Sequence, residues 1–311
     1  MNSLLEEKQQ YEAPSAPKAL RGGERRLSVA ALAVAVLALC VACAALLLQL
    51  RAPRQSEPET PAVEEPTVEE PAVIRFRNHV LPVLENVPVN GFAAEAFHRD
   101  GAGYLRYADA PLGVDVSSYQ GEIDWERVAA SGVKFAMIRA GLRGYTKGGL
   151  MEDSMFRRNI EGALAAGLDV GVYFFSQAVS VAEAEEEADV LLELVEGYDL
   201  SYPLVYDWET VEDDAARTVG VGSDMVTDCA RAFCERVAAA GYTPMVYFNL
   251  DQGYLSYHLD ELTDFLFWLA EYRDCPSFYY HYDFLQYTHQ GTVDGIEGYV
   301  DLDLDLRLPV N

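Results

Sequence analysis

Basic residues are scarce in this chain of 311 residues, which has 23 Lys and Arg against 50 Asp and Glu and a formal net charge of -27. Nucleic-acid binding needs a basic surface that releases counterions from phosphates, so DNA and RNA are excluded as partners. Patterns for metal binding are also missing. Cys40 and Cys43 lie within an apolar run, Cys229 and Cys234 are five residues apart, and no HExxH sequence occurs. We therefore expect neither a metal nor a cofactor.

Phosphate and calcium loops are absent as well. Gly220-Val-Gly222 lacks the third glycine of a dinucleotide fingerprint and does not directly follow a strand pattern. The acidic alternation that begins at Asp301 has Leu306 where a calcium loop needs glycine, and no glutamate follows at the twelfth position. Both classes of site are rejected.

Long apolar runs are limited to one, LSVAALAVAVLALCVACAALLL at 27–48, and a mean hydropathy near zero excludes a polytopic membrane protein. Such a run can cross a hydrocarbon core of about 30 Å. Lys18, Arg21, Arg25 and Arg26 precede it, which favours a cytoplasmic N-terminus. We expect a cytoplasmic tail (1–26) and a transmembrane helix (27–50), so that the chain is a single-pass membrane protein. A cleaved signal peptide and lipidation at Cys43 are the alternatives.

Two segments separate this run from the rest of the chain. Residues 51–72 combine Pro, Glu and small residues, which predicts an extended linker that cannot bury a core. Residues 73–110 carry the turn signals Asn90-Gly91 and Asp100-Gly101 beside strand-like runs. We expect a small β-rich subdomain there, without chemistry of its own.

From 111 onward, strand and helix patterns alternate. Eight short apolar runs, bounded by Gly, Pro or turn residues, read as strands near 112–117, 135–141, 169–175, 203–209, 243–248, 265–272, 283–288 and 299–304. Segments with the apolar spacing of helices lie between the first five of these strands. Ser180 and Glu183 predict a capping box at the start of one such helix. The pattern predicts an α/β fold for 111–311, a TIM-like barrel with five βα units plus three further strands. An open doubly wound sheet is the alternative.

Acidic residues stand at the expected carboxyl ends of these strands, where barrels place functional groups. Asp207 and Glu209 are two residues apart, so on a strand both point to one face. Like-charge proximity and burial would raise one pKa and leave one acid protonated near neutral pH. Such a pair is what cleavage of a glycosidic bond requires. A pair of solvated carboxylates in a loop is the alternative.

Other strand ends add acids and flat aromatic rings. Asp115 ends the first strand, whereas Asp301 is as compatible with a polar strand face as with a site. Aromatic rings pack on the apolar faces of sugars, and acids bind the hydroxyls. The further residues at strand ends are Arg139, Tyr173, Phe175, Tyr247, Trp268, Tyr272, Gln286 and Tyr287.

Several of these segments together resemble one known family. GVDVSSYQGEIDW (113–125), FAMIRAG (135–141), LVYDWE (204–209), WLAEY (268–272) and LQYTHQGTVDGIEG (285–298) fall in the order seen in glycoside hydrolase family 25, the lysozymes of the N-acetylmuramidase type. The resemblance covers 111–308. It implies a barrel with five βα units and three further strands.

The resemblance also implies roles for individual residues. Glu209 would be the general acid, and Asp207 would assist the substrate N-acetyl group in a retaining mechanism. Asp115 and Asp301 would complete the acidic cluster, and Tyr173, Tyr247, Trp268, Gln286 and Arg139 would line the sugar groove. Two departures from the family pattern are Leu285, where Trp is frequent, and Asp303, where Asn is frequent.

The expected function is that of a membrane-anchored, extracytoplasmic peptidoglycan hydrolase that cuts the β-1,4 bond between N-acetylmuramic acid and N-acetylglucosamine. Its expected partners are the peptidoglycan glycan strand and, through the N-terminal helix, the membrane. The alternatives are a non-catalytic peptidoglycan-binding tether with the same fold and a glycosidase that acts on another N-acetylated glycan.

Overall fold

The computed structural model describes residues 72–307, and its centre is a closed barrel of eight strands. Around the barrel, each strand pairs with the next in the order β5, β6, β8, β9, β10, β11, β12, β13, and β13 pairs back with β5. Neighbours from β5 to β12 are parallel, whereas β13 is antiparallel to both of its neighbours. The strands are β5 (Leu112–Val116), β6 (Phe135–Arg143), β8 (Asp169–Ser176), β9 (Leu204–Trp208), β10 (Pro244–Asn249), β11 (Leu266–Ala270), β12 (Phe284–Gly291) and β13 (Val300–Asp305).

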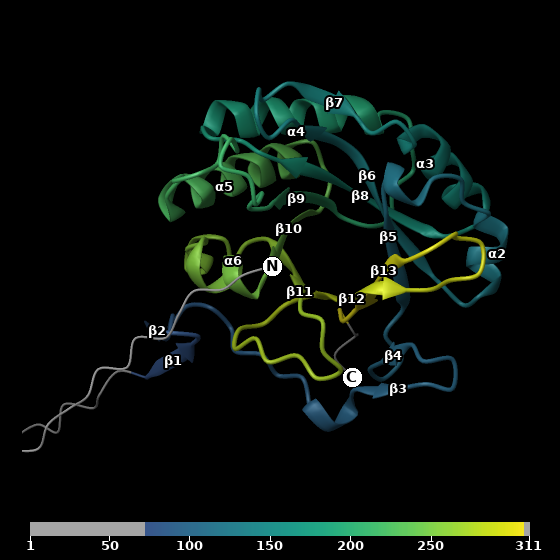
Figure 1. Cartoon of the computed structure of the whole chain (residues 1–311), viewed down its shortest axis with the longest axis horizontal. Helices are drawn as coiled ribbons and strands as arrows, with labels where there is room; N and C mark the ends of the chain where they lie inside the picture. Colours follow the sequence, from purple (N-terminus) through teal and green to yellow (C-terminus); the bar gives the residue numbers. More distant parts are fainter. Residues whose placement is uncertain (1–71, 308–311) are drawn as a thin grey trace, which may run out of the picture. The chain divides into compact units, whose positions relative to one another are not determined.

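Helices connect the parallel strands and lie outside the barrel (Figure 1). Glycines with positive φ end two of them, Gly167 at 77° and Gly241 at 91°, because a residue with a Cβ is strained there. A short strand, β7 (Leu150–Glu152), extends the sheet beside β6. The helices are α2 (Trp125–Ala130), α3 (Phe156–Ala165), α4 (Val181–Val195), α5 (Ser223–Ala239) and α6 (Leu250–Leu255), with 3-10 turns η1 (Ala94–Ala96), η2 (Ser118–Gln120) and η3 (Leu259–Glu261).

Alternation along the strands divides the apolar side chains between two cores. Tyr206 and Trp208 of β9 belong to the core between barrel and helices, whereas Val205 belongs to the core inside the barrel. Met137, Met245 and Phe284 fill the interior from other strands, together with Phe135, Trp268 and Ala270. Because both faces of each strand are buried, the strands read in the sequence as continuous apolar runs.

The predicted α/β barrel is confirmed as a closed eight-stranded sheet with helices, and all eight expected runs form strands. The predicted capping box at α4 is only half formed. Ser180 Oγ accepts a hydrogen bond from the Glu183 backbone N–H at 3.4 Å. The Glu183 carboxylate instead accepts from the Val179 N–H and from Arg217, because this guanidinium competes for it.

The predicted localisation is corrected by the structure. Among residues 72–307, no helix is long and apolar enough to cross a membrane. The longest described helix, α5, has 17 residues and turns one apolar face to the barrel, as a covering helix does. The apolar run at 27–48, like the tail and most of the linker beside it, lies outside the described residues. For the residues that the structure describes, the prediction of a single-pass membrane protein is wrong.

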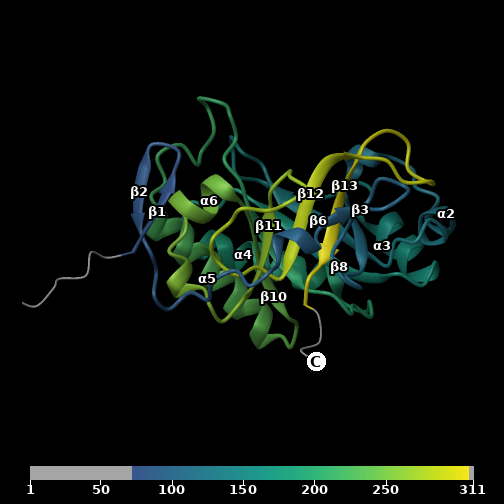
Figure 2. The ribbon, with the colours of Figure 1, turned by 90° about the horizontal axis from the view of Figure 1, so that it is seen from below.

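Residues 73–110 form two small β-pairs, β1 (Val73–Phe76) with β2 (His79–Pro82) and β3 (His98–Arg99) with β4 (Leu105–Arg106). The β1–β2 hairpin lies beside α6 in Figures 1 and 2, where the rings of Phe76 and Tyr254 are 4.7 Å apart. Further along, Asn90 N–H donates to the Tyr279 carbonyl at 2.8 Å, and Phe92 packs on Tyr282. The segment thus packs on the loop between β11 and β12, a part of the barrel where no long helix follows the strands.

Leu105 tests whether this segment contributes to stability. Its side chain is fully buried in the core that lies outside the barrel. Leu105→Ala should lower the free energy of unfolding by about 2–5 kcal/mol, because it removes apolar contacts and leaves a cavity. Urea unfolding of the full chain measures the loss. Val80→Ala, on the exposed side of β2, is the control, and equal small losses in both variants would contradict a stabilising role.

Candidate functional site

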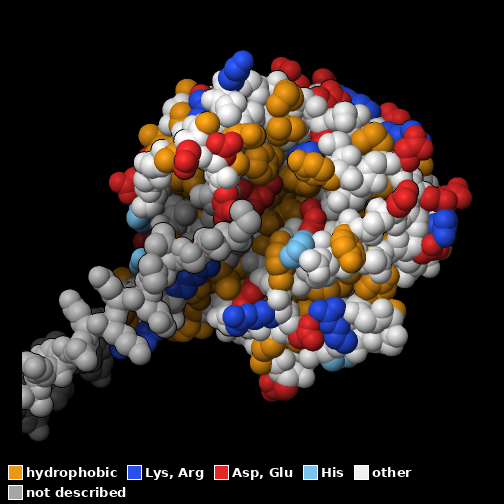
Figure 3. All heavy atoms as spheres, in the orientation of Figure 1, with side chains coloured by type: hydrophobic (Ala, Val, Ile, Leu, Met, Phe, Trp, Pro, Cys, Tyr) orange, Lys and Arg blue, Asp and Glu red, His pale blue; other side chains and the backbone are white. Residues whose placement is uncertain are grey.

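A pocket of about 500 Å³ opens where the carboxyl ends of the barrel strands meet. All nine residues predicted as site residues line it, namely Asp115, Arg139, Tyr173, Asp207, Glu209, Tyr247, Trp268, Gln286 and Asp301. Figure 3 shows a hollow on the molecular surface with acidic side chains inside it and hydrophobic side chains around them. The barrel therefore brings together residues that are far apart in the sequence.

Asp207 and Glu209 lie at the carboxyl end of β9, and both line the pocket, as the spacing predicts. Two buried amides hold this strand end. Gln177 Nε2 donates to the Glu209 carbonyl at 2.7 Å, and Gln252 Nε2 donates to the Trp208 carbonyl at 2.8 Å. Gln252 is itself fixed in a capping box with Asn249 at the start of α6. The backbone that carries the two acids is thus clamped from both sides.

The acids differ in depth and in pKa. Burial, and after it the nearby Asp301 carboxylate, together raise the pKa of Glu209 to about 6. Burial likewise raises the pKa of Asp301 to about 6. The pKa values of Asp207 and Asp115 are raised well above the ordinary range, first by burial and then by Glu209 and Asp301 respectively. The cluster therefore retains protons at pH values where isolated carboxylates have lost them.

Gln286 connects two tyrosines to Asp115. Its Oε1 accepts from the hydroxyls of Tyr247 at 3.0 Å and Tyr272 at 2.9 Å. Its Nε2 donates to Asp115 Oδ2 at 2.7 Å. Because hydroxyl donors occupy the amide oxygen, the amide nitrogen must face the acid, and this fixes the orientation of the side chain.

Arg139 is the cation of the pocket, and it is held by a buried acid. Its guanidinium forms an ion pair with Asp153 at 2.7 Å, and its carbon Cζ lies 5.2 Å from the ring centre of Tyr119. Asp153 also accepts the Ser118 N–H at 3.1 Å, which ties β6 to the loop after β5. The charge of Arg139 lowers the pKa of Asp207, opposing the larger effects of burial and Glu209.

The aromatic side chains fall into a floor and a rim. Trp268 and Tyr247 are almost fully buried, with ring centres 4.9 Å apart, so they form the floor. Tyr119, Tyr145 and Tyr272 are exposed by 86%, 40% and 50% and also line the pocket. Sequence reasoning placed Tyr272 and Phe175 at strand ends without giving them a role, and it missed Tyr119, Tyr145, Leu142 and Val211. Most of them belong to loops, and the alternating pattern that locates strand residues in a sequence does not extend to loops. Tyr287, also a candidate, is buried outside the barrel.

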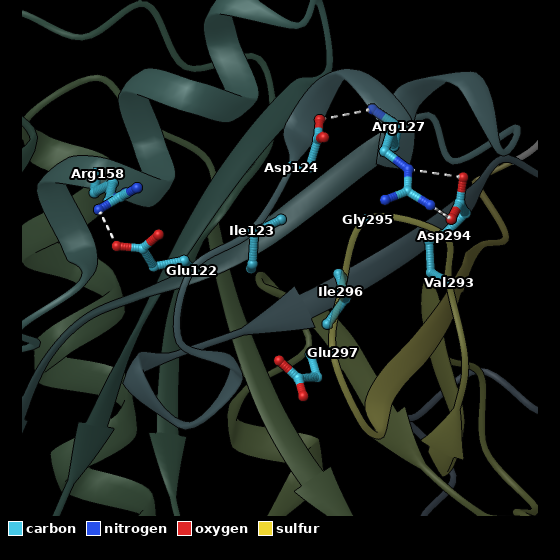
Figure 4. A pocket seen from close by; sticks show the side chains of 10 residues that line it. All are labelled: Glu122, Ile123, Asp124, Arg127, Arg158, Val293, Asp294, Gly295, Ile296 and Glu297. Carbon is cyan, nitrogen blue, oxygen red and sulfur yellow. Dashed lines mark hydrogen bonds and ion pairs between the residues drawn. The ribbon is translucent and has the colours of Figure 1, made fainter.

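A second pocket, of about 420 Å³, lies between the start of α2 and the loop that joins β12 to β13 (Figure 4). Its two arginines are paired, Arg127 with Asp294 and Arg158 with Glu122. The backbone carbonyl of Gly295 accepts from the Asp124 N–H at 2.9 Å, so the loop rests on the helix start. Both arginines are therefore neutralised, and the acids Asp124 and Glu297 leave the pocket with excess negative charge. Within residues 72–307, no group of His, Cys, Asp and Glu is arranged to hold a metal ion.

Comparisons with known proteins agree on one family. The model of the family described as glycosyl hydrolases family 25 matches residues 114–296. An autolytic lysozyme of Clostridium acetobutylicum is 30% identical over 196 residues, which cover 61% of this chain and 54% of that protein. The match thus spans about half the length of this curated relative.

Solved structures show the same fold. A family 25 glycosyl hydrolase from Bacillus anthracis is 25% identical with a TM-score of 0.56, and the match covers 70% of this chain and 96% of that one. The modular autolysin LytC from Streptococcus pneumoniae has a TM-score of 0.57 at 24% identity, with 73% of this chain and 53% of that chain covered. The second likeness supports the fold alone.

Proposed function

Because the chain belongs to glycosyl hydrolases family 25, we propose that it is a lysozyme-type peptidoglycan hydrolase that cleaves the β-1,4 bond between N-acetylmuramic acid and N-acetylglucosamine. The observation that carries the proposal is the placement of Asp207 and Glu209 from one strand end in one pocket. Hydrolysis of a glycosidic bond needs two carboxyl groups in different protonation states. Identity of 30% to an autolytic lysozyme supports the same activity.

Glu209 is the general acid in this proposal. Cleavage leaves an alkoxide unless the glycosidic oxygen gains a proton as the bond breaks, so the donor must be protonated at working pH. Burial and Asp301 raise the pKa of Glu209 to about 6, so Glu209 is protonated below that pH and in part at neutral pH. Glu209 is also less buried than Asp207, which favours contact with an incoming oxygen.

Asp207 assists the substrate N-acetyl group. Its Oδ1 is buried and has no hydrogen-bond partner among the described residues, so in this proposal the substrate amide N–H donates to the other oxygen, Oδ2. Orientation of that amide brings its carbonyl oxygen to the anomeric carbon, and the intermediate carries positive charge. Asp115 and Asp301 add negative charge nearby, which stabilises a cationic intermediate in a site of low dielectric constant. Arg139, Tyr173, Tyr247, Trp268 and Gln286 bind the sugar in this proposal.

The full-length chain with purified peptidoglycan tests the function. We expect soluble muropeptides and new reducing ends, and mass spectrometry should place N-acetylmuramic acid at those ends. N-acetylglucosamine at the reducing ends would instead assign another glycosidase activity. Binding to insoluble peptidoglycan without soluble fragments would assign the non-catalytic tether. Either result would overturn the proposed reaction.

Gln286→Glu tests the hydrogen bond that Gln286 donates to Asp115. The substitution replaces the donated N–H, 2.7 Å from Asp115, by an acid of nearly the same shape. We expect kcat/KM to fall about tenfold at pH 7, because a neutral donor is replaced by a group that repels Asp115 when ionised. Part of the activity should return at lower pH, where the new acid is protonated. Gln290→Glu, exposed on the same strand, should cost little, and equal losses in both variants would contradict this role.

We also propose that the barrel is TIM-like, with five βα units followed by three strands. A helix follows each of β5, β6, β8, β9 and β10 in the described order, and long helices are absent after β11 and β12 within residues 72–307. We retain 73–110 as a β-rich segment separate from the barrel domain at 111–311. A truncation series around residue 111, followed by thermal unfolding, tests this boundary.

A further inference from the structure

Asp303 is a buried acid that the proposed reaction does not use. It lies on β13 between Asp301, which lines the pocket, and Asp305, which pairs with Arg307 at 2.7 Å. Within residues 72–307, no lysine, arginine or histidine forms an ion pair with Asp303. Its carboxyl group does not line the pocket itself but accepts a hydrogen bond from Trp268, which does.

The hydrogen bonds of Asp303 leave one oxygen poorly satisfied. The residue is fully buried, and its Oδ1 accepts from Trp268 Nε1 at 3.0 Å. Its Oδ2 is buried and has no partner of strict hydrogen-bond geometry among the described residues. In the pairing of β13 with β5, Asp301 lies opposite Asp115 and Asp303 lies opposite Gly113, so Asp303 is two residues along from the position opposite Asp115 on the same face. The two carboxyl groups are within reach of a side-chain hydrogen bond. Two carboxyl groups in such contact cannot both be ionised at low cost, because like charges repel strongly in a buried site.

The titratable groups that face Asp303 offer no compensation for a second negative charge. They are Asp115 from β5, Asp301 from β13 itself and Tyr272 after β11, whereas Tyr287 of β12 lies on the outer face of the sheet. Arg139, the cation of the pocket, is engaged by Asp153 instead. Burial and then Asp301 raise the pKa of Asp303 well above its ordinary value.

We propose that Asp303 is a positioning residue that shares one proton with Asp115, so that the two acids form a buried carboxyl pair in the barrel that carries Asp207 and Glu209. The shared proton forms a hydrogen bond between Asp303 and one oxygen of Asp115, while Gln286 Nε2 donates to Asp115 Oδ2. The pair then carries one negative charge instead of two under the reacting sugar. The positioning role of Asp303 in catalysis rests on the proposed function. The sharing of a proton between Asp303 and Asp115 does not depend on that function.

Asparagine at 303 imitates the protonated acid at every pH. Its amide oxygen accepts from Trp268, and its amide nitrogen donates to Asp115. Leucine has a similar size and offers neither function. The contrast between Asp303→Asn and Asp303→Leu therefore separates loss of the donor from loss of packing.

Thermal unfolding of the full-length chain at pH 5 and pH 8 tests the proton itself. If folded Asp303 keeps a proton that the unfolded chain loses, stability falls as pH rises from the unfolded pKa toward the folded one. Asp303→Asn cannot lose a proton at this position, so it does not show this fall in stability. The Tm difference between Asp303→Asn and the wild type should therefore be larger, in favour of the variant, at pH 8 than at pH 5. Each pH unit in this window adds about 3–5 °C.

Asp305→Asn is the matched control, because it makes the same change two residues along β13 at an acid that has a cation partner. Its Tm difference from wild type should be no more favourable at pH 8 than at pH 5. A gain in Asp303→Asn that does not grow with pH, or a loss at pH 8, would overturn the shared proton.

Peptidoglycan hydrolysis tests the positioning role. kcat of Asp303→Leu should be at least about tenfold below that of Asp303→Asn, because Asp115 loses its donor. The alkaline side of the pH profile should differ between Asp303→Asn and wild type, since only the wild type can lose the shared proton. Equal kcat values for Asn and Leu would refute positioning. If the wild type cleaves no peptidoglycan, the proposed function fails. The Tm comparison still shows whether Asp303 and Asp115 share a proton.

Discussion

Glu209→Gln should reduce kcat for peptidoglycan hydrolysis by about a thousandfold, within the 10²–10⁴ range of general acid catalysis. Glutamine keeps the shape of the side chain but cannot give a proton to the leaving oxygen. KM should change little, since Glu209 acts mainly as the bond breaks. Release of reducing ends by the full chain measures the effect.

Folding does not explain such a loss. Folded Glu209 has a raised pKa, so this residue costs stability once pH exceeds the ordinary glutamate pKa, and the cost is complete above about 6. Glu209→Gln should therefore have an equal or higher Tm than wild type at pH 7. Glu212→Gln, an exposed acid of the same loop, should keep wild-type activity. A Glu209→Gln enzyme with more than a tenth of wild-type kcat would remove Glu209 from the role of acid.

The pH profile follows from the same group. The active form has a protonated Glu209, so kcat/KM should fall toward alkaline pH once the pH exceeds about 6, approaching tenfold per unit. Protonation of Asp207 at low pH should reduce activity on the acidic side. Glu209→Gln should lose the alkaline decline, because it has no proton to release at that position.

Asp207→Asn should lower kcat by about 10²–10³, the usual cost of losing one electrostatic stabiliser of the transition state. The amide keeps the shape of the side chain but carries no charge to oppose the positive charge of the intermediate. The variant also loses the charge repulsion between Asp207 and Glu209, so the pH profile should shift as well. Steady-state kinetics across pH measure both effects.

Substrate design separates assistance from simple charge stabilisation. If Asp207 orients the N-acetyl group, the wild type should lose most of its rate when the substrate is N-deacetylated peptidoglycan. Asp207→Asn has already lost this assistance, so its rate should be nearly the same on the acetylated and the deacetylated substrate. Asp214→Asn, an exposed acid a few residues away, is the matched control. Equal sensitivity of wild type and Asp207→Asn to deacetylation would contradict the assisting role.

Strand positions could be predicted because burial on both faces leaves a local signature. The run at 204–208 is apolar apart from Asp207, and β9 covers those residues. The i, i+2 spacing also placed Asp207 and Glu209 on one face, since the period of a strand is two. Loops have no such period. Tyr119 and Tyr145 accordingly escaped prediction, although they lie in the rim of the pocket.

The bonds within the site could not be derived from sequence. Gln286 is 171 residues from Asp115, and no local pattern states that its amide donates to that acid. Asp301, Asp303 and Asp305 look alike in the alternation of β13. The structure gives them different surroundings: Asp301 lines the pocket, Asp303 meets Trp268, and Asp305 meets Arg307.

The sequence by itself determined the order of the strands, the excess of acids and the spacing of the central pair, because these depend on neighbours along the chain. Only the tertiary structure decided which acids are buried without a cation, since closure of the barrel brings β5 and β13 together from opposite ends of the domain. Burial and charge proximity then set the pKa values of Glu209 and Asp301. These quantities depend on distance in space, and the linear order of residues does not contain it.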